Sequence, residues 1–285
     1  MPPRAIANDL SAFGRHAPRG WLSGLVRTAR LCGTHWAGQR LAFALRAIGI
    51  RALGGRPLDV ESLGARMRLY PGHNVAEKNL LFTPQYFDPK ERRFLAERLG
   101  SDFVFIDIGA NVGGYALFVA TLAGPRARVL AIEPQADIFE RLTFNIRQNS
   151  FPAIKALELA VTDRDGEVTL FVDAKNKGET SMRLVGTQGP AASVRVPGKA
   201  LGSILAEEGF DRVDAMKLDV EGAEDLILEA FFRDVAPRLW PRILIVEDAP
   251  GRWAIDLPGL IAQQGYTVAL KTRTNVVYER PPAGE

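Results

Sequence analysis

A buried strand that runs directly into a glycine-rich turn constrains the fold of this chain more than any other feature. Residues 103–106 are all apolar, and the turn that follows reads Asp107-Ile-Gly-Ala-Asn-Val-Gly-Gly114. An apolar helix is predicted next, over residues 115–123. In an open α/β sheet, a glycine-rich turn after the first strand lets a ligand approach bare backbone. The segment therefore predicts a ligand site at the first strand of such a sheet.

The rest of the chain alternates apolar strands with amphipathic helices. Further strands are predicted over residues 129–132, 156–161, 214–218 and 243–246, with helices over 134–146, 223–232 and 257–264. Residues 168–172 are predicted to be antiparallel, 173–200 to be a long excursion outside the core, and 267–270 with 275–278 to be a terminal hairpin. This order predicts an α/β, Rossmann-like fold with a mainly parallel, doubly wound sheet and a C-terminal antiparallel hairpin.

The first fifth of the chain is strongly basic. Residues 1–58 contain nine arginines and one acid, a balance of +8 in a chain whose net charge is +3, so the remainder carries −5. Apolar residues recur at helical intervals over 20–50, and we expect Gly33 and Gly38 to break this segment into two helices. Two interpretations stay open: an accessory segment packed on the domain, or a basic amphipathic helix in peripheral contact with a membrane surface.

Composition excludes several classes of protein. With 47% hydrophobic and 24% charged residues, the chain is not disordered throughout. Its one cysteine, Cys32, forms no internal disulfide and has no neighbours at metal-ligand spacing, which suits a reducing compartment, and we expect a cytoplasmic location. Arginines interrupt every apolar stretch near the N-terminus, so neither a membrane span nor a cleaved secretion signal is expected.

The acid in the glycine-rich turn separates two kinds of cofactor. The glycine spacing does not match the dinucleotide pattern G-x-G-x-x-G, which places a pyrophosphate over a helix N-terminus. Here Asp107 would repel a phosphate but attract the ammonium of an amino acid. Glu133 follows the second strand, 24 residues after Gly109, where an acid can hold ribose hydroxyls. S-adenosylmethionine carries an amino-acid end and no phosphate, so it fits this pair of acids.

Five segments in order along the predicted strands carry a resemblance to a known family. They read Phe105-Ile-Asp-Ile-Gly-Ala-Asn-Val-Gly-Gly-Tyr115, Ala131-Ile-Glu-Pro134, Ala160-Val-Thr-Asp163, Lys217-Leu-Asp-Val-Glu-Gly-Ala-Glu224 and Ile245-Val-Glu247. From about residue 85 to 280 the chain resembles the FkbM family of methyltransferases. The resemblance implies a class I methyltransferase fold, S-adenosylmethionine as methyl donor, and a hydroxyl of a sugar, polyketide or similar metabolite as acceptor. We expect a basic helical segment over residues 1–57 and a methyltransferase domain over 58–285, with its core at about 100–280.

Cofactor-binding residues follow from the resemblance position by position. It implies that Asp107, Gly109, Asn111 and Gly113 shape the methionine pocket and that Glu133 holds the ribose. Val161 and Asp163 would flank the adenine, although Asp163 is equally well placed to begin the turn that ends at Gly166.

Three further acids are candidates for the general base. Asp219 and Glu221 lie at the carboxyl end of the fourth strand, where the order of the sheet should reverse, and Glu247 ends the fifth strand. Methyl transfer is an in-line displacement on an activated carbon, so positioning and water exclusion supply much of the rate. A carboxylate in a dry pocket can take the acceptor's proton, and Asp219 or Glu221 is the first choice, ahead of Glu247. The alternatives are that Asp219 holds the cofactor's amino end or that Glu221 caps the next helix, and Lys217 is expected to pair with an acid.

The sequence gives little indication of a metal site and does not identify the acceptor. No histidine has a ligand partner at suitable spacing, so no metal is expected, although carboxylates at 219, 221 and 247 could converge. We expect residues 86–88 to form a wall of the pocket and the acceptor to be a small molecule or a glycan, with no nucleic acid as partner. The competing functions are a non-catalytic S-adenosylmethionine-binding module and an NAD-dependent oxidoreductase.

Overall fold

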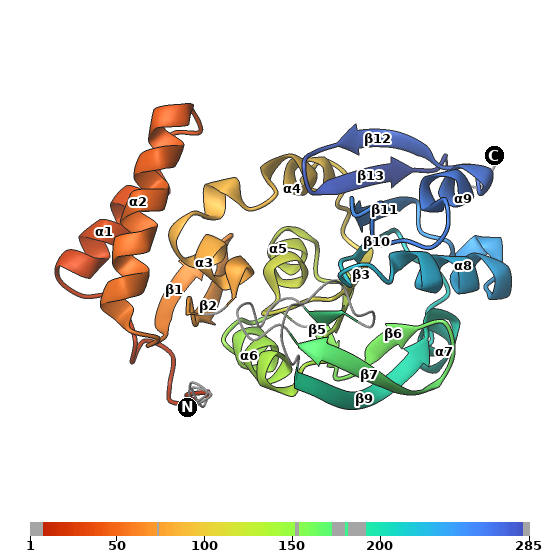
Figure 1. The fold of residues 1–285 in the computed structure, drawn as a ribbon, viewed down its shortest axis with the longest axis horizontal. Helices are drawn as coiled ribbons and strands as arrows, with labels where there is room; N and C mark the ends of the chain where they lie inside the picture. The colour runs from red at the N-terminus through yellow and green to blue at the C-terminus, as the bar shows by residue number, and fades with distance from the viewer. Residues whose placement is uncertain (1–7, 73, 152–153, 173–179, 182–191, 282–285) are drawn as a thin grey trace.

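A seven-stranded sheet forms the centre of the computed structural model, which describes residues 8–72, 74–151, 154–172, 180–181 and 192–281 (Figure 1). The strands lie in the order β12-β13-β11-β10-β3-β4-β5. The five from β11 to β5 are parallel, whereas β13 runs antiparallel to both β11 and β12. The predicted mainly parallel sheet with a C-terminal hairpin is confirmed. The strand bounds are β3 (Val104–Ile108), β4 (Arg128–Ile132), β5 (Ile154–Leu157), β10 (Ala215–Leu218), β11 (Ile243–Glu247), β12 (Thr267–Lys271) and β13 (Asn275–Glu279).

Helices cover both faces of this sheet (Figure 1). One face packs against α4 (Pro89–Ala96), α5 (Gly114–Leu122) and α6 (Ala136–Arg147). The other packs against α7 (Leu201–Glu207), α8 (Glu224–Asp234) and α9 (Leu257–Gln263). Because side chains alternate along a strand, Ile106 and Ile108 face α7 and α8, while Phe105 faces α5. Asp107, the next-to-last residue of β3, therefore has its side chain on the same side of the sheet as α5.

The winding of the sheet reverses between β3 and β10. The chain passes from β3 to β4 and β5 in one direction and then returns to place β10 and β11 on the other side of β3. The pairing of β3 with β10 extends past the strand ends, because the Asp219 amide donates to the Ile108 carbonyl at 3.0 Å. Ligands of open α/β sheets bind at the carboxyl ends of strands at such a reversal.

A second sheet differs from the prediction. Its order is β6-β9-β7-β8, with bounds β6 (Ala160–Thr162), β7 (Gly166–Val172), β8 (Thr180–Ser181) and β9 (Ala192–Ala200). The single strand predicted over 156–161 is wrong, because β5 and β6 belong to different sheets. The excursion predicted over 173–200 is wrong for β9, which pairs with both β6 and β7; Pro197 and Gly198 obscured this strand, since both residue types are disfavoured in strands. Residues 173–179 and 182–191 lie outside the described residues.

The N-terminal segment forms the two predicted helices, α1 (Trp21–Leu31) and α2 (Trp36–Leu53). The break is at residues 32–35, where the His35 ring accepts from the Gly38 amide and caps α2. Gly38, which was expected to contribute to this break with Gly33, lies inside α2 instead, and a Cβ there would overlap the Gly33 carbonyl. Gly38 thus lets the linker pack against the helix. The next elements along the chain are β1 (Leu58–Ser62), β2 (Ala65–Leu69), α3 (Val75–Phe82) and the 3-10 turn η1 (Pro84–Tyr86). A second 3-10 turn, η2 (Pro237–Leu239), lies much later in the chain and precedes β11.

This segment is packed on the domain. Val26 and Leu53 join a core with β1, β2 and α3. The buried guanidinium of Arg68, on β2, pairs with Asp59 at 2.6 Å and donates to the carbonyls of residues 9, 11 and 12. Among the described helices, none has the length and apolar content that crossing a membrane requires.

Candidate active site

A cavity of about 670 Å³ opens at the carboxyl ends of β3, β4, β10 and β11. Eight of the ten residues predicted for the site line it: Asp107, Gly109, Asn111, Glu133, Val161, Asp219, Glu221 and Glu247. The two that do not are Gly113 and Asp163. The topology therefore gathers residues that are more than a hundred positions apart into one cavity.

The glycine-rich turn is held tightly against both neighbouring strands. The amides of Gly109 and Ala110 both donate to the Ile132 carbonyl at the end of β4. Gly109 has a φ of +76°, and a Cβ there would overlap the carbonyl oxygen of Asp219. Gly113, with a φ of +95°, is the N-cap residue of α5, and a Cβ there would meet Leu142 and Leu117. Gly109 thus shapes the wall of the cavity, and Gly113 supports the turn from behind.

Asp107 is buried at the base of the cavity. Its Oδ2 accepts from the Ala116 amide in the first turn of α5 at 2.9 Å. Burial raises the pKa of Asp107 to about 6, against the opposing effect of the nearby Lys217 ammonium. A buried carboxylate favours a cationic ligand group, because such a group lowers the cost of keeping the charge buried.

The Lys217 ammonium forms an ion pair with Asp219 and also interacts with the charge of Asp107. It lies opposite Asp107 in the β3–β10 register, its Nζ is 2.6 Å from Asp219 Oδ2, and the ammonium lies 5.0 Å from the centre of the Tyr115 ring. Burial lowers the pKa of Lys217, but Asp219 and Asp107 outweigh that effect and hold the pKa above its ordinary value. Lys217 is therefore a charged partner of acids, as the sequence predicted.

Glu133 is fixed by backbone donors. Its Oε2 accepts from the Asn111 amide at 3.0 Å and its Oε1 from the Gln135 amide at 2.9 Å. Burial raises the pKa of Glu133 to about 7, and these two bonds oppose the rise. Each carboxylate oxygen has a second lone pair, so the oriented side chain can still accept bonds from the hydroxyls of a ligand.

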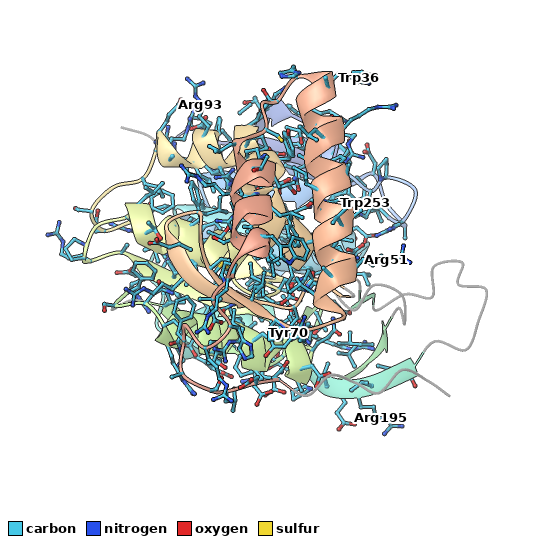
Figure 2. All side chains as sticks on the ribbon, turned by 90° about the vertical axis from the view of Figure 1, so that its left-hand side faces the viewer. Trp36, Arg51, Tyr70, Arg93, Arg195 and Trp253 are labelled. Atoms are coloured by element: carbon cyan, nitrogen blue, oxygen red, sulfur yellow. The ribbon has the colours of Figure 1, made fainter. Side chains whose placement is uncertain are left out.

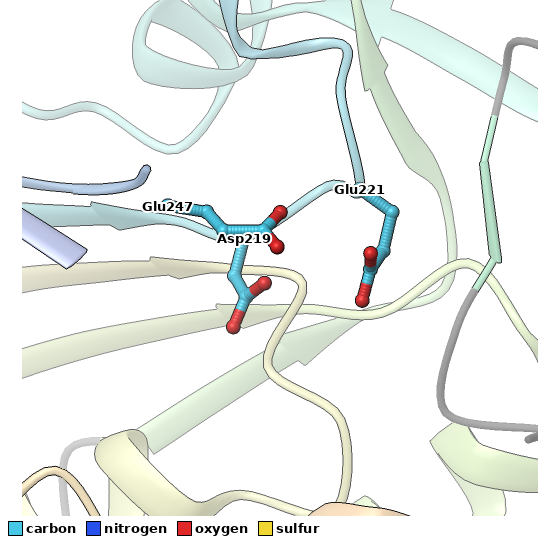
Figure 3. A group of neighbouring side chains, drawn as sticks. All are labelled: Asp219, Glu221 and Glu247. Atoms are coloured by element: carbon cyan, nitrogen blue, oxygen red, sulfur yellow. The ribbon is translucent and has the colours of Figure 1, made fainter. Parts of the chain in front are cut away.

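Three acids converge beside this pocket (Figure 3). Asp219, Glu221 and Glu247 each bring a carboxylate oxygen within 4.8 Å of the other two. Glu221 has a left-handed φ of +56° and pairs with Arg252 at 2.5 Å, and Asp219 pairs with Lys217. At this spacing the three carboxylates could coordinate one metal ion. Among the described residues, this is the one group of which that is true.

Glu247 differs from the other two acids. Its Oε2 is buried and has no hydrogen-bond partner among the described residues, and Oε1 lies 3.9 Å from Arg252 Nη1. Burial, followed by the charges of Asp219 and Glu221, raises the pKa of Glu247 to about 8. Glu247 can therefore take up a proton near neutral pH.

The far wall contains predicted and unpredicted residues. Residues 86–88 line the cavity as predicted, and Asp88 accepts from the Tyr115 hydroxyl at 3.0 Å. Asn74 was missed, although the pattern Asn74-x-x-Glu77 is that of a helix cap: it caps α3 and donates to Asn111 Oδ1 at 2.7 Å. Residues 272–275, between β12 and β13, and Thr34 and Gln39 also line the cavity, without a local signal in the sequence.

Val161 and Asp163 separate in the structure. Val161 is buried on β6 and lines the cavity. Asp163 is exposed in the turn between β6 and β7, where the Thr162 hydroxyl donates to the Arg164 carbonyl. This geometry matches the alternative in which Asp163 begins the turn.

The charge of the cavity discriminates between ligands. Its described lining contains seven acids and three cationic side chains, Lys90, Lys217 and Arg273. A pyrophosphate would meet net repulsion here, whereas a ligand with an ammonium and a sulfonium would be attracted. The bare backbone at Gly109 and the oriented Glu133 complete a site that fits S-adenosylmethionine.

The fold and this acidic, glycine-walled cavity define a Rossmann-like class I methyltransferase. The family model described as "Methyltransferase FkbM domain" matches residues 107–263, and the chain belongs to this family, in which S-adenosylmethionine is the cofactor.

The chain is similar to three characterised proteins. They are the AMB antimetabolite synthetase AmbE of Pseudomonas aeruginosa (26% identical, 70% of this chain), the 31-O-demethyl-FK506 methyltransferase FkbM of Streptomyces tacrolimicus (26%, 68%) and the hexuronic acid methyltransferase AglP of Haloferax volcanii (28%, 48%). The chain spans 11% of the length of AmbE, 84% of FkbM and 53% of AglP.

Proposed function

We propose that this protein transfers a methyl group from S-adenosylmethionine to a hydroxyl oxygen of a sugar, a glycan or a similar polyhydroxylated metabolite. The observation that carries the proposal is the convergence of Asp219, Glu221 and Glu247 beside the pocket that contains Asp107 and Glu133. The similarity to FkbM, a 31-O-demethyl-FK506 methyltransferase, and to AglP, a hexuronic acid methyltransferase, supports the same acceptor class.

Asp107 and Glu133 orient the donor. Asp107 faces its ammonium, and Glu133, held by two backbone amides, accepts from its ribose hydroxyls. Bound S-adenosylmethionine supplies a methyl group made electrophilic by a sulfonium. The protein's contribution is then to hold the acceptor oxygen in line with that methyl group, to exclude water and to accept one proton.

Glu247 is the best placed to accept that proton. Asp219 and Glu221 already have cationic partners, since their carboxylates pair with Lys217 and Arg252. Oε2 of Glu247 is buried with no hydrogen-bond partner in the described part of the chain, and the pKa of Glu247 is raised to about 8. We therefore reverse the order derived from the sequence: Glu247 acts as general base, while Asp219 and Glu221 position the acceptor through its other hydroxyls.

The acidic cavity also supports an acceptor other than a nucleic acid. Seven acids at the site would repel the phosphates of a nucleic acid, despite the basic N-terminal segment. Carboxylates at several positions around the cavity suit a molecule with many hydroxyl donors.

A methyl-transfer assay with a labelled donor, run across glycans, glycolipids and polyols, tests this function. We expect label on an acceptor oxygen, and calorimetric binding of S-adenosylmethionine that Asp107→Asn and Glu133→Gln each weaken. Binding of the donor without transfer to any acceptor would indicate a non-catalytic module. Binding of NAD in preference to S-adenosylmethionine would indicate an oxidoreductase.

A further inference from the structure

The outer face of α2 is apolar and basic, with no acid. Trp36, Leu41, Phe43 and Ile48 are large apolar side chains that remain exposed along it, Trp36 to 70% and Ile48 to 54%. The other exposed residues of α2 are alanines, Gln39, Arg40 and Arg51. Figure 2 looks onto this side of the molecule, with Trp36 near one end of the helix and Arg51 near the other. An 18-residue helix is about 27 Å long, so this face is an extended surface.

The exposed surface of α1 is also apolar and basic. Trp21 and Leu31 are exposed at its two ends, and Arg27 is exposed between them. Residues 10–58 contain no Asp or Glu at all. A soluble protein seldom leaves several large apolar side chains on one face, unless that face meets a partner.

The chemistry of this face specifies an anionic lipid surface. Tryptophans at the edge of an apolar face, with arginines among them, are the features of helices that lie in the membrane interface. Arg40 stacks over the Trp36 ring at 4.5 Å, which holds a cation beside an aromatic ring at the depth of the headgroups. Arginine stems can lie along apolar surface while their guanidinium groups reach phosphates.

We propose that α1 and α2 dock this protein on an anionic membrane surface. The inward sides of both helices are already used, since Val26, Ala29, Ala42 and Leu53 are buried against the domain. The docking surface is therefore the outward side of α1 and α2, and the buried inward side chains attach both helices to the domain. Thr34 and Gln39, at the beginning of α2, also line the catalytic cavity, so docking brings the cavity next to the lipid surface.

Vesicle sedimentation of the full chain tests the proposal. We expect binding to vesicles that contain equal amounts of phosphatidylglycerol and phosphatidylcholine, weaker binding to phosphatidylcholine alone, and a loss of binding with rising salt. Arg40→Glu combined with Arg51→Glu should reduce partitioning by roughly tenfold or more. The matched control is Arg195→Glu combined with Arg238→Glu, which changes the charge equally at exposed positions outside this segment and should leave most of the binding intact.

A second measurement separates insertion from charge attraction. Lipids brominated in the acyl chains should quench the fluorescence of Trp21 and Trp36, and Trp21→Phe with Trp36→Phe should remove that quenching while binding persists. Equal loss of binding in both charge-reversed variants, or binding without quenching, would overturn the proposal. So would self-association without lipid that Trp36→Ser and Ile48→Ser abolish, because the face would then bind a second copy of the chain.

Discussion

The carbonyl oxygen of Asp219 occupies the space that a Cβ on Gly109 would need. This contact joins the glycine-rich turn after β3 to the segment after β10 that contains Asp219 and Glu221. Any side chain at 109 must push these two segments apart, and the left-handed φ of +76° penalises it further.

Gly109→Ala should therefore damage both the pocket and the fold. We expect S-adenosylmethionine affinity to fall by more than tenfold and the free energy of unfolding to fall by about 1–3 kcal/mol. Calorimetry and chemical denaturation measure the two quantities. Gly251→Ala is the control, because nothing lies within 4 Å of a Cβ there; equal behaviour of the two variants would show that the contact is unimportant.

Glu247→Gln should remove the general base. We expect kcat to fall by about 10²-fold or more, with S-adenosylmethionine binding within a few-fold of the unchanged protein. Asp219→Asn and Glu221→Gln should each cost less, about tenfold, because they position the acceptor. Glu229→Gln, on the exposed side of α8, is the control. If Asp219→Asn or Glu221→Gln has the largest effect on kcat, the base is that residue and not Glu247.

The pH dependence of kcat follows from the same residue. A general base works in its deprotonated form, and the pKa of Glu247 is raised to about 8. The rate should therefore rise with pH through about 8 and level off above it. Steady-state kinetics at saturating substrates would show this limb, which Glu247→Gln should flatten. A limb that persists in the variant would assign the titration to another group.

Arg68 should be a major source of stability for the N-terminal segment. Arg68→Met leaves the buried Asp59 carboxylate without its guanidinium and removes three bonds to backbone carbonyls. We expect the free energy of unfolding to fall by about 3–5 kcal/mol, the range for breaking a buried ion pair. Arg66→Met, at an exposed position on the same strand, should change it by less than about 1 kcal/mol. Denaturant titration of both variants decides between them.

Chelation should leave the activity largely intact. Lys217 and Arg252 already compensate two of the three converging carboxylates, so the group needs no cation to offset its charge. We expect turnover in EDTA to stay within about twofold of the untreated rate, measured after dialysis. A loss that Mg²⁺ restores would instead identify Asp219, Glu221 and Glu247 as ligands, since their spacing permits it.

Local patterns in the sequence predicted most strands of the central sheet, the helices α5, α6, α8 and α9, and the terminal hairpin. Apolar periodicity marks strands such as β3 and β10, and the glycine-rich turn marks the ligand site between them. The pattern could not divide residues 154–162 between two sheets, because an apolar run does not show which strand it will pair with. It also missed β9, where Pro197 and Gly198 weaken the strand signal.

The sequence by itself determined the kind of site: an acid and bare backbone after the first strand, an acid after the second, and three acids after the fourth and fifth. Only the tertiary structure decided how these acids differ. Arg252 reaches Glu221 from 31 positions away and Lys217 pairs with Asp219, while Oε2 of Glu247 is buried and no other described residue bonds to it. Proton affinity depends on the charges and solvent around a carboxylate in space, and a linear sequence does not contain those distances.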